Sequence, residues 1–168
     1  SAVILLLGRT SLLTGDAGCG KTTMLRAALF ELRDSKTRSV LLTNPTLTRA
    51  EFYEFLSREF GLSEQAAVSQ TKFLEEMETV LEARFAEGGL TGLVIDEAQS
   101  VPDDLLEEIR LLGNIETAST KLLNIVLAGQ PELLDRLKDP SLQPLKQRIA
   151  LRCELKTFDL SETASYIA

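Results

Sequence analysis

Histidine is absent from the 168-residue sequence, and cysteine occurs only twice. Without histidine, catalysis by a Ser-His-Asp or Cys-His arrangement is excluded, as are histidine-ligated metal sites, so chemistry must use Lys, Arg, Asp, Glu or hydroxyl groups. Cys19 and Cys153 cannot form a zinc site alone and indicate no disulfide framework, which favours a reducing compartment.

Long apolar runs are missing as well. The longest candidate, Ala2 to Leu7, is far shorter than the roughly 20 residues of a membrane-spanning helix. The sequence has 18 Lys and Arg against 25 Asp and Glu, a net charge of −7, which disfavours general binding to nucleic acid. It has no signal peptide, lacks an initial Met and stops in a helix-like stretch at Ala168. We therefore expect a piece of a longer protein that makes no direct membrane contact.

Apolar runs of strand length alternate with longer stretches of helical period, the pattern of a parallel sheet covered by helices on both faces. The expected strands are 10–14, 38–43, 90–95, 122–128 and 149–155. The expected helices are 21–33, 49–60, 70–86, 103–116, 131–138 and 142–147. The sequence thus predicts one α/β domain over residues 1–168, a three-layer αβα sandwich around a five-stranded parallel sheet.

A segment between the first expected strand and the first expected helix matches G-x-x-x-x-G-K-[ST]. Its residues are Gly15, Asp16, Ala17, Gly18, Cys19, Gly20, Lys21 and Thr22, and Thr23 continues the helix. Glycines let backbone N–H groups turn toward a polyphosphate, and the helix presents its positive end to the same anion. We expect these nine residues to bind a nucleotide, with Lys21 on the β- and γ-phosphates and the Thr22 hydroxyl on Mg²⁺. The alternative is a glycine-rich turn with an ordinary surface lysine.

The apolar strand Leu93-Val94-Ile95 ends in two adjacent carboxylates, Asp96 and Glu97. Strand alternation points them in different directions, so Asp96 is expected to hold the Mg²⁺ shell and Glu97 to polarise the water that attacks the γ-phosphate. A solvated acidic turn is the alternative. The D-x-x-G and N-K-x-D segments of GTP-binding switch proteins are absent, and a small-molecule kinase needs no Glu after the strand-end Asp. The pair therefore favours hydrolysis of ATP.

Six further blocks occur in order along the chain: Thr43-Asn44-Pro45, Val94-Ile95-Asp96-Glu97-Ala98-Gln99, Leu106-Glu107-Glu108-Ile109-Arg110-Leu111-Leu112-Gly113-Asn114-Ile115-Glu116-Thr117, Lys121-Leu122-Leu123, Ala128-Gly129-Gln130-Pro131-Glu132-Leu133 and Gln147-Arg148-Ile149. With the phosphate loop, they resemble the AAA+ ATPase domain of the general secretion pathway protein A (ExeA/GspA) family over nearly the whole chain. ATPases that assist transposition share some of these blocks.

The resemblance implies three more catalytic residues. Asn44 matches a position whose side chain hydrogen-bonds the catalytic Glu97 and holds it unproductive, although a turn residue ahead of proline is the alternative. Gln130 matches the sensor-1 position that reads the γ-phosphate; the alternative is a cap for the helix that follows. Arg148 matches the arginine finger that acts in a neighbouring subunit. The alternative is a cation placed at a helix C-terminus, and Lys146 and Arg152 are nearby rivals for the finger.

The resemblance also implies a cellular role. It suggests the cytoplasmic domain of an inner-membrane protein, a homo-oligomer that uses ATP and Mg²⁺ to drive assembly or insertion of a secretion-pathway complex. Secretion-pathway membrane proteins would be partners through regions outside this chain, and the family's C-terminal helical lid is largely missing because it would begin at Ala168. Two alternatives remain: a DNA-associated ATPase that regulates transposition, and a nucleotide-gated interaction module with negligible turnover. The acidic charge balance argues against DNA, and Glu97 argues against an inactive site.

Overall fold

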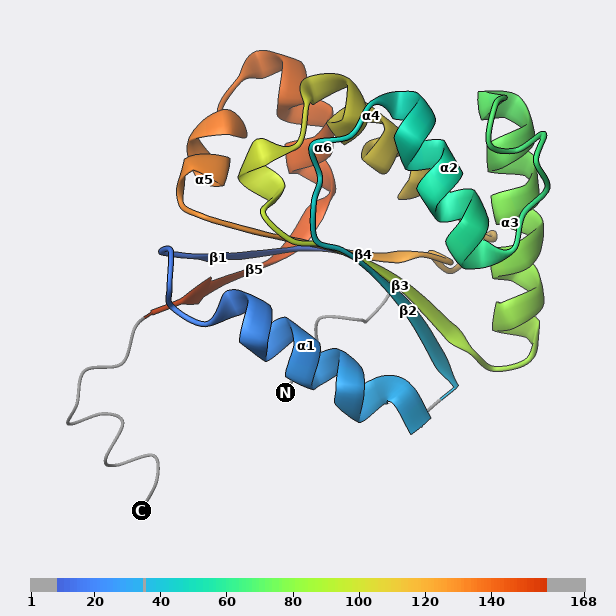
Figure 1. Cartoon of the computed structure of the whole chain (residues 1–168), viewed down its shortest axis with the longest axis horizontal. Coiled ribbons are helices and arrows are strands. Elements are labelled where there is room, and N and C mark those ends of the chain that lie inside the picture. Colours follow the sequence, from blue (N-terminus) through green and yellow to red (C-terminus); the bar gives the residue numbers. More distant parts are fainter. Residues whose placement is uncertain (1–8, 35, 157–168) are drawn as a thin grey trace.

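Five strands form one sheet in the computed structural model, which describes residues 9–34 and 36–156 (Figure 1). They are β1 (Thr10–Gly15), β2 (Thr37–Leu42), β3 (Leu90–Ile95), β4 (Asn124–Gly129) and β5 (Ile149–Leu155). The strand order is β2-β3-β4-β1-β5, and every pairing is parallel. The predicted five-stranded parallel sheet is therefore confirmed, and each strand begins within two residues of the predicted position.

The helices cover the two faces of this sheet unequally (Figure 1). They are α1 (Lys21–Glu31), α2 (Arg49–Phe60), α3 (Gln70–Ala86), α4 (Asp103–Leu112), α5 (Glu132–Arg136) and α6 (Gln143–Arg148), with 3₁₀ turns η2 (Leu32–Asp34), η3 (Ala98–Ser100) and η4 (Pro140–Leu142). Helix α1 lies on one face, and α2 to α6 lie on the other, which gives the expected three layers. Among the described residues, no helix is long and apolar enough to cross a membrane.

Strand alternation divides the apolar residues between two cores. Leu93 and Ile95 of β3 join the large core under α2 to α6, whereas Val94 between them joins the small core under α1. Successive side chains of a strand point to opposite faces, so a continuous apolar run is what a strand covered on both faces requires. Phe52 of α2 and Leu25 of α1 are the buried counterparts from the two helical layers.

Local capping explains which helix boundaries the sequence predicted well. Helix α2 begins after Thr48, whose side chain accepts a hydrogen bond from the N–H of Glu51, and it ends at Gly61 in the left-handed conformation. Helix α4 instead ends at Leu112, four residues before the predicted end at 116. The chain turns at Gly113 and forms a bridge between Glu116 and Lys121, so the expected last helical turn is wrong. The helix-like stretch 162–168 and the expected start of a lid lie outside the described residues.

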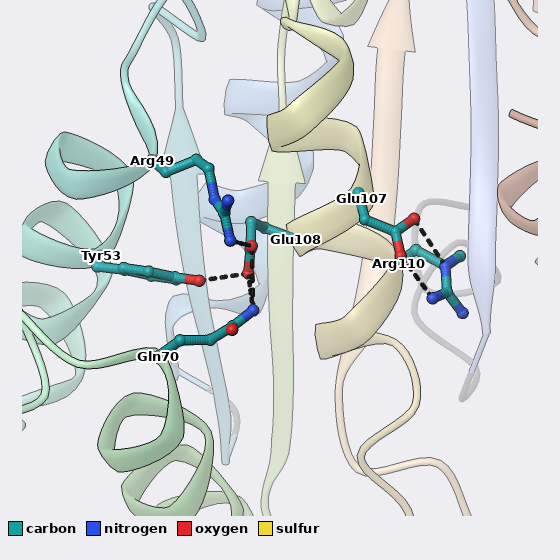
Figure 2. Close-up of polar contacts among 6 residues, drawn as sticks. All are labelled: Arg49, Tyr53, Gln70, Glu107, Glu108 and Arg110. Carbon is teal, nitrogen blue, oxygen red and sulfur yellow. Dashed lines mark hydrogen bonds and ion pairs between the residues drawn. The ribbon is translucent and has the colours of Figure 1, made fainter. Parts of the chain in front are cut away.

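A buried carboxylate ties α4 to α2 and to the start of α3 (Figure 2). Glu108 is 3% exposed and accepts hydrogen bonds from Arg49, from the hydroxyl of Tyr53 and from Nε2 of Gln70, which lies 3.1 Å from both carboxylate oxygens. Burial, together with the hydrogen bond to Glu108, raises the pKa of Tyr53 to about 12. Because α4 follows the predicted catalytic carboxylates in the chain, this network anchors the segment that leads away from them.

Candidate functional site

Apart from Arg148, the predicted site residues lie where parallel strands end. The phosphate loop follows β1, the acid pair follows β3 and Gln130 follows β4, and these strands are neighbours in the order β3-β4-β1. Parallel strands place their carboxyl ends on one edge of the sheet, which is where open α/β folds bind ligands. The paired residues Thr14 and Gly129 show that the phosphate loop and Gln130 start at the same level.

Glycine is required in the phosphate loop for two different reasons. Gly18 and Gly20 have φ values of 78° and 90°, where other residues are strained, although a Cβ on either would meet no atom within 4 Å. Gly15 is required for space, because a Cβ there would lie 2.6 Å from Sγ of Cys19 and 2.7 Å from the carbonyl oxygen of Leu155. The loop is thus curled and closely packed at its start.

Lys21 is a buried cation without a carboxylate partner among the described residues. Lys21 is only 6% exposed, and its Nζ donates to the carbonyl oxygen of Gly15 at 2.5 Å and to that of Asp16 at 2.9 Å. Helix α1 begins after Gly20, which supplies no side-chain cap, and its first turn contains no acidic residue. Buried charges are normally paired, so the ammonium and the uncapped helix start together favour an anion at this position.

The phosphate loop and the acid pair are joined by a direct contact. Thr22 Oγ1 donates to Asp96 Oδ2 at 2.6 Å, and the N–H of Glu97 donates to Asp96 Oδ1 at 2.9 Å. Asp96 is 2% exposed. A hydroxyl beside a carboxylate is a hard oxygen donor set that fits Mg²⁺, which binds few protein ligands when phosphates complete its shell. The described residues contain no group of three or more His, Cys, Asp or Glu that could hold a metal by themselves.

Glu97 has an unusual backbone conformation. Its φ of 53° makes it the one non-glycine residue with a positive φ in the described part of the chain. The left-handed conformation destabilises a non-glycine residue by about 1–2 kcal/mol, and such strain concentrates at functional sites. Asp96 accepts hydrogen bonds from Thr22 and from the N–H of Glu97, whereas the carboxylate of Glu97 accepts one from Gln99, so the two carboxylates contact different groups.

Gln99, a residue for which the sequence pattern predicted no role, contacts Glu97. Its Nε2 donates to Glu97 Oε2 at 2.5 Å, while its Oε1 accepts the N–H of Gln130 at 3.0 Å. The only sequence signal was its place in the Asp-Glu-Ala-Gln block, two residues after the catalytic candidate. No pattern of neighbouring residues could predict its contact with Gln130, which lies 31 positions away in the sequence.

Asn44 and Gln130 lie at the same edge but differ in their contacts. Asn44 is exposed, and its Oδ1 accepts the N–H of Thr46 at 3.4 Å, the local turn contact that was its alternative; within the described residues it makes no hydrogen bond to Glu97. Gln130 is half-buried between the phosphate loop and the acid pair, and no side-chain cap is found at the start of α5. Its place therefore suits a sensor better than a helix cap.

Arg148 lies at the opposite edge of the sheet. It ends α6 immediately before β5, whose first residue pairs with Thr10, whereas the phosphate loop begins where Gly15 pairs with the end of β5. At about 3.3 Å per residue, the five steps from Thr10 to Gly15 separate the two positions by roughly 16 Å. Arg148 is exposed, so its guanidinium can meet another subunit but not its own phosphate loop.

The surroundings of Arg148 are cationic. Arg9, Lys121 and Arg148 line a cavity of about 250 Å³. The hydrogen bond and the charge of Lys121 lower the pKa of nearby Glu116, and the charge of Arg148 acts in the same direction. The carboxylate of Glu116 is thus paired with Lys121 at 2.5 Å, which leaves Arg148 without an ion pair among the described residues.

Comparisons with known proteins place the chain in a family. A family model described as an AAA domain matches residues 8–137. General secretion pathway protein A from Aeromonas hydrophila is 36% identical over 156 residues, which is 93% of this chain but 28% of that protein. The chain therefore spans less than a third of that relative.

Solved structures show the same fold at low sequence identity. The Aeropyrum pernix ORC2 protein in its ADP form superposes with a TM-score of 0.73 at 14% identity, over 99% of this chain and 49% of that one. A point mutant of Thermotoga maritima RuvB superposes with a TM-score of 0.55 at 18% identity, over 96% of this chain and 42% of that one.

Proposed function

Since the chain belongs to the AAA domain family and is a P-loop ATPase domain, we propose that it is the Mg²⁺-dependent ATPase module of a secretion-pathway protein. The observation that carries the chemistry is the contact between Thr22 and Asp96, which joins a phosphate loop to an acid pair 74 residues away. Neither half could hydrolyse ATP alone, because one binds phosphate and the other activates water.

The loop binds the nucleotide. The amides at the start of α1 and the ammonium of Lys21 meet the β- and γ-phosphates, and Gly15 to Thr23 form the wall of the site. On nucleotide binding, Lys21 exchanges its carbonyl partners for phosphate oxygens. Thr22 and Asp96 are the residues that would hold Mg²⁺, and the bound ion would supply positive charge to the phosphates.

The acid pair carries out hydrolysis. Glu97 orients and polarises the attacking water, and Gln130 between the loop and the acids senses the γ-phosphate. Asn44 lies just past the end of the neighbouring strand. In its proposed role, its side chain rotates so that Oδ1 releases the N–H of Thr46 and Nδ2 donates to the carboxylate of Glu97. This assignment leaves Lys21 and Mg²⁺ as the cations of the site, with no arginine to meet the charge that develops on the γ-phosphate in the transition state.

A neighbouring subunit supplies that arginine. Arg148 is exposed and roughly 16 Å along the sheet from its own loop, so it acts as the finger for the next subunit in a homo-oligomer. The similarity to general secretion pathway protein A supports a cytoplasmic domain of an inner-membrane protein. In this proposal, membrane components of the secretion pathway bind regions outside this chain, and hydrolysis drives their assembly or insertion.

The experiment separates binding from turnover. Glu97→Gln should bind ATP as the unaltered chain does but hydrolyse it about 10²- to 10⁴-fold more slowly, because an amide cannot polarise water as a carboxylate does. Lys21→Ala should lose ATP binding, and removal of Mg²⁺ by EDTA should stop turnover. Glu132→Gln, an exposed carboxylate on α5, is the matched control. Wild-type turnover by Glu97→Gln would overturn the assignment.

A further inference from the structure

Gln99 holds the catalytic carboxylate by a contact that none of the roles above uses. Its side-chain amide spans two strand ends: Nε2 donates to Glu97 Oε2 after β3, and Oε1 accepts the N–H of Gln130 after β4. The reverse orientation of the amide would set a carbonyl against a carboxylate and an NH₂ group against an N–H. The two partners therefore determine which end of the amide faces Glu97.

The backbone of Gln99 is fixed as well. Arg136 of α5 donates from Nη1 to the carbonyl oxygen of Gln99 at 3.0 Å and also to that of Val101, and its Nη2 pairs with Asp103 at the start of α4. The turn that carries Gln99 is thus clamped from the helix that follows Gln130. Both polar atoms of the Gln99 side chain and its backbone carbonyl oxygen are hydrogen-bonded, so the side chain has little freedom to move away from Glu97.

Gly129 provides the space for this amide. A Cβ at position 129 would lie 2.7 Å from Gln99 Oε1 and 3.2 Å from the backbone nitrogen of Gln99. Its φ is not positive, so the backbone conformation does not explain why glycine is needed here. The end of β4 is therefore shaped to admit the side chain of Gln99.

We infer that Gln99 is a positioning residue, which presents the carboxylate of Glu97 to the attacking water and couples it to the end of β4 where Gln130 lies. Glu97 leaves its strand in a left-handed turn and is only half-buried, so without a partner its carboxylate would sample several rotamers. The hydrogen bond occupies Oε2 and leaves Oε1 for water. Asn44, which accepts the N–H of Thr46, does not supply this restraint in the described structure.

The inference rests on the proposed role of Glu97, and isosteric variants test it separately. Gln99→Glu keeps an acceptor for the N–H of Gln130 but replaces the donor to Glu97 with a second carboxylate. Gln99→Met keeps the length of the side chain and removes both bonds. Both variants should lower kcat by on the order of 10- to 100-fold, with KM and the dissociation constant for ATP within about twofold of the unaltered chain.

Gly129→Ala provides a variant that changes neither partner. Its new methyl group should push the side-chain amide of Gln99 out of its two hydrogen bonds, and kcat should fall with ATP affinity retained. Turnover is measured with Mg²⁺ at the protein concentration where the unaltered chain has its highest specific activity, and far-UV circular dichroism confirms folding. Wild-type kcat in a folded Gln99→Glu variant would overturn the inference.

A double variant distinguishes positioning of Glu97 from a general structural role. If Gln99 acts through Glu97, adding Gln99→Met to Glu97→Gln should lower the residual rate no further. If the two residues act independently, the fold-losses in rate of the single variants should multiply. Multiplied losses would assign Gln99 to general support of the fold. If Glu97→Gln itself retains full turnover, the role proposed for Glu97 fails and this inference fails with it. If only the Gln99 variants retain full turnover, the role of Glu97 stands and this inference alone fails.

Discussion

Replacing Glu108 with Gln should destabilise the domain far more than the same replacement at the adjacent Glu107. Glu108 is buried and accepts hydrogen bonds from Arg49, Tyr53 and Gln70 (Figure 2). Glu107 is 53% exposed, and among the described residues its carboxylate pairs only with Arg110 on its own helix. The two positions share a helix and the same chemical change. Their comparison therefore isolates the effect of the buried network.

The magnitude follows from the partners. A hydrogen bond to a charged group stabilises by about 1.5–3 kcal/mol and one between neutral groups by about 0.5–1.5 kcal/mol. The amide introduced by Glu108→Gln would keep one acceptor oxygen for the two donors, Tyr53 and Gln70. One of their two hydrogen bonds would become neutral and stabilise the fold by about 1 kcal/mol less, and the other would be lost at a cost of about 2 kcal/mol. Arg49 is 48% exposed and adds little. We expect a loss of about 3 kcal/mol at Glu108 and at most about 1 kcal/mol at Glu107.

The assay is urea unfolding followed by far-UV circular dichroism, because the sequence has no Trp to report on the core. The urea concentration at the unfolding midpoint should fall without a change in the m-value. The melting temperature should fall by about 2–4 °C for each kcal/mol of unfolding free energy that is lost. A double-mutant cycle that combines Glu108→Gln with Tyr53→Phe then isolates the hydrogen bond between Tyr53 and Glu108. The reasoning is refuted if the two Glu→Gln variants differ by less than about 1 kcal/mol, or if the coupling of Tyr53 and Glu108 is below about 0.5 kcal/mol.

Three further predictions concern the nucleotide site, the oligomer and alkaline pH. Mixing Arg148→Ala with Lys21→Ala subunits should restore part of the ATPase activity that each lacks alone; no recovery in mixed oligomers seen by native mass spectrometry would exclude a finger in trans. N-ethylmaleimide should block ATP binding through Cys19, whose Sγ lies 3.7 Å from Lys21 Nζ, and bound ATP should protect Cys19 but not the exposed Cys153, as peptide mass spectrometry can show. Because the folded pKa of Tyr53 is raised to about 12, its neutral form stabilises the fold fully below pH 10 and less as pH rises toward 12. The stability advantage of the unaltered chain over Tyr53→Phe, measured by urea unfolding, should shrink across that range, and a constant difference would contradict the shift.

Local chemistry in the sequence was sufficient for the elements and for the phosphate loop. Helix α2 begins and ends at the predicted residues, with Thr48 as its N-cap and Gly61 as its C-cap. Caps act within one helical turn, so they can be predicted from neighbouring positions in the sequence. The loop from Gly15 to Thr22 was also predicted, since glycines, a lysine and a helix start lie within eight consecutive residues. The end of α4 was misplaced because the chain turns at Gly113, and Glu116 then forms a β-bridge with Lys121, a pairing that the helical period does not reveal.

Only the tertiary structure decided which distant residues meet. The strand order β2-β3-β4-β1-β5 brings the acid pair, Gln130 and the phosphate loop to one edge and leaves Arg148 at the other. It also sets Gln99 between Glu97 and Gln130. Hydrophobic period reports which face of an element is buried, but it carries no record of which strand lies beside which, or at what register. Contacts that depend on register between segments far apart in the chain therefore emerge only when the sheet is assembled.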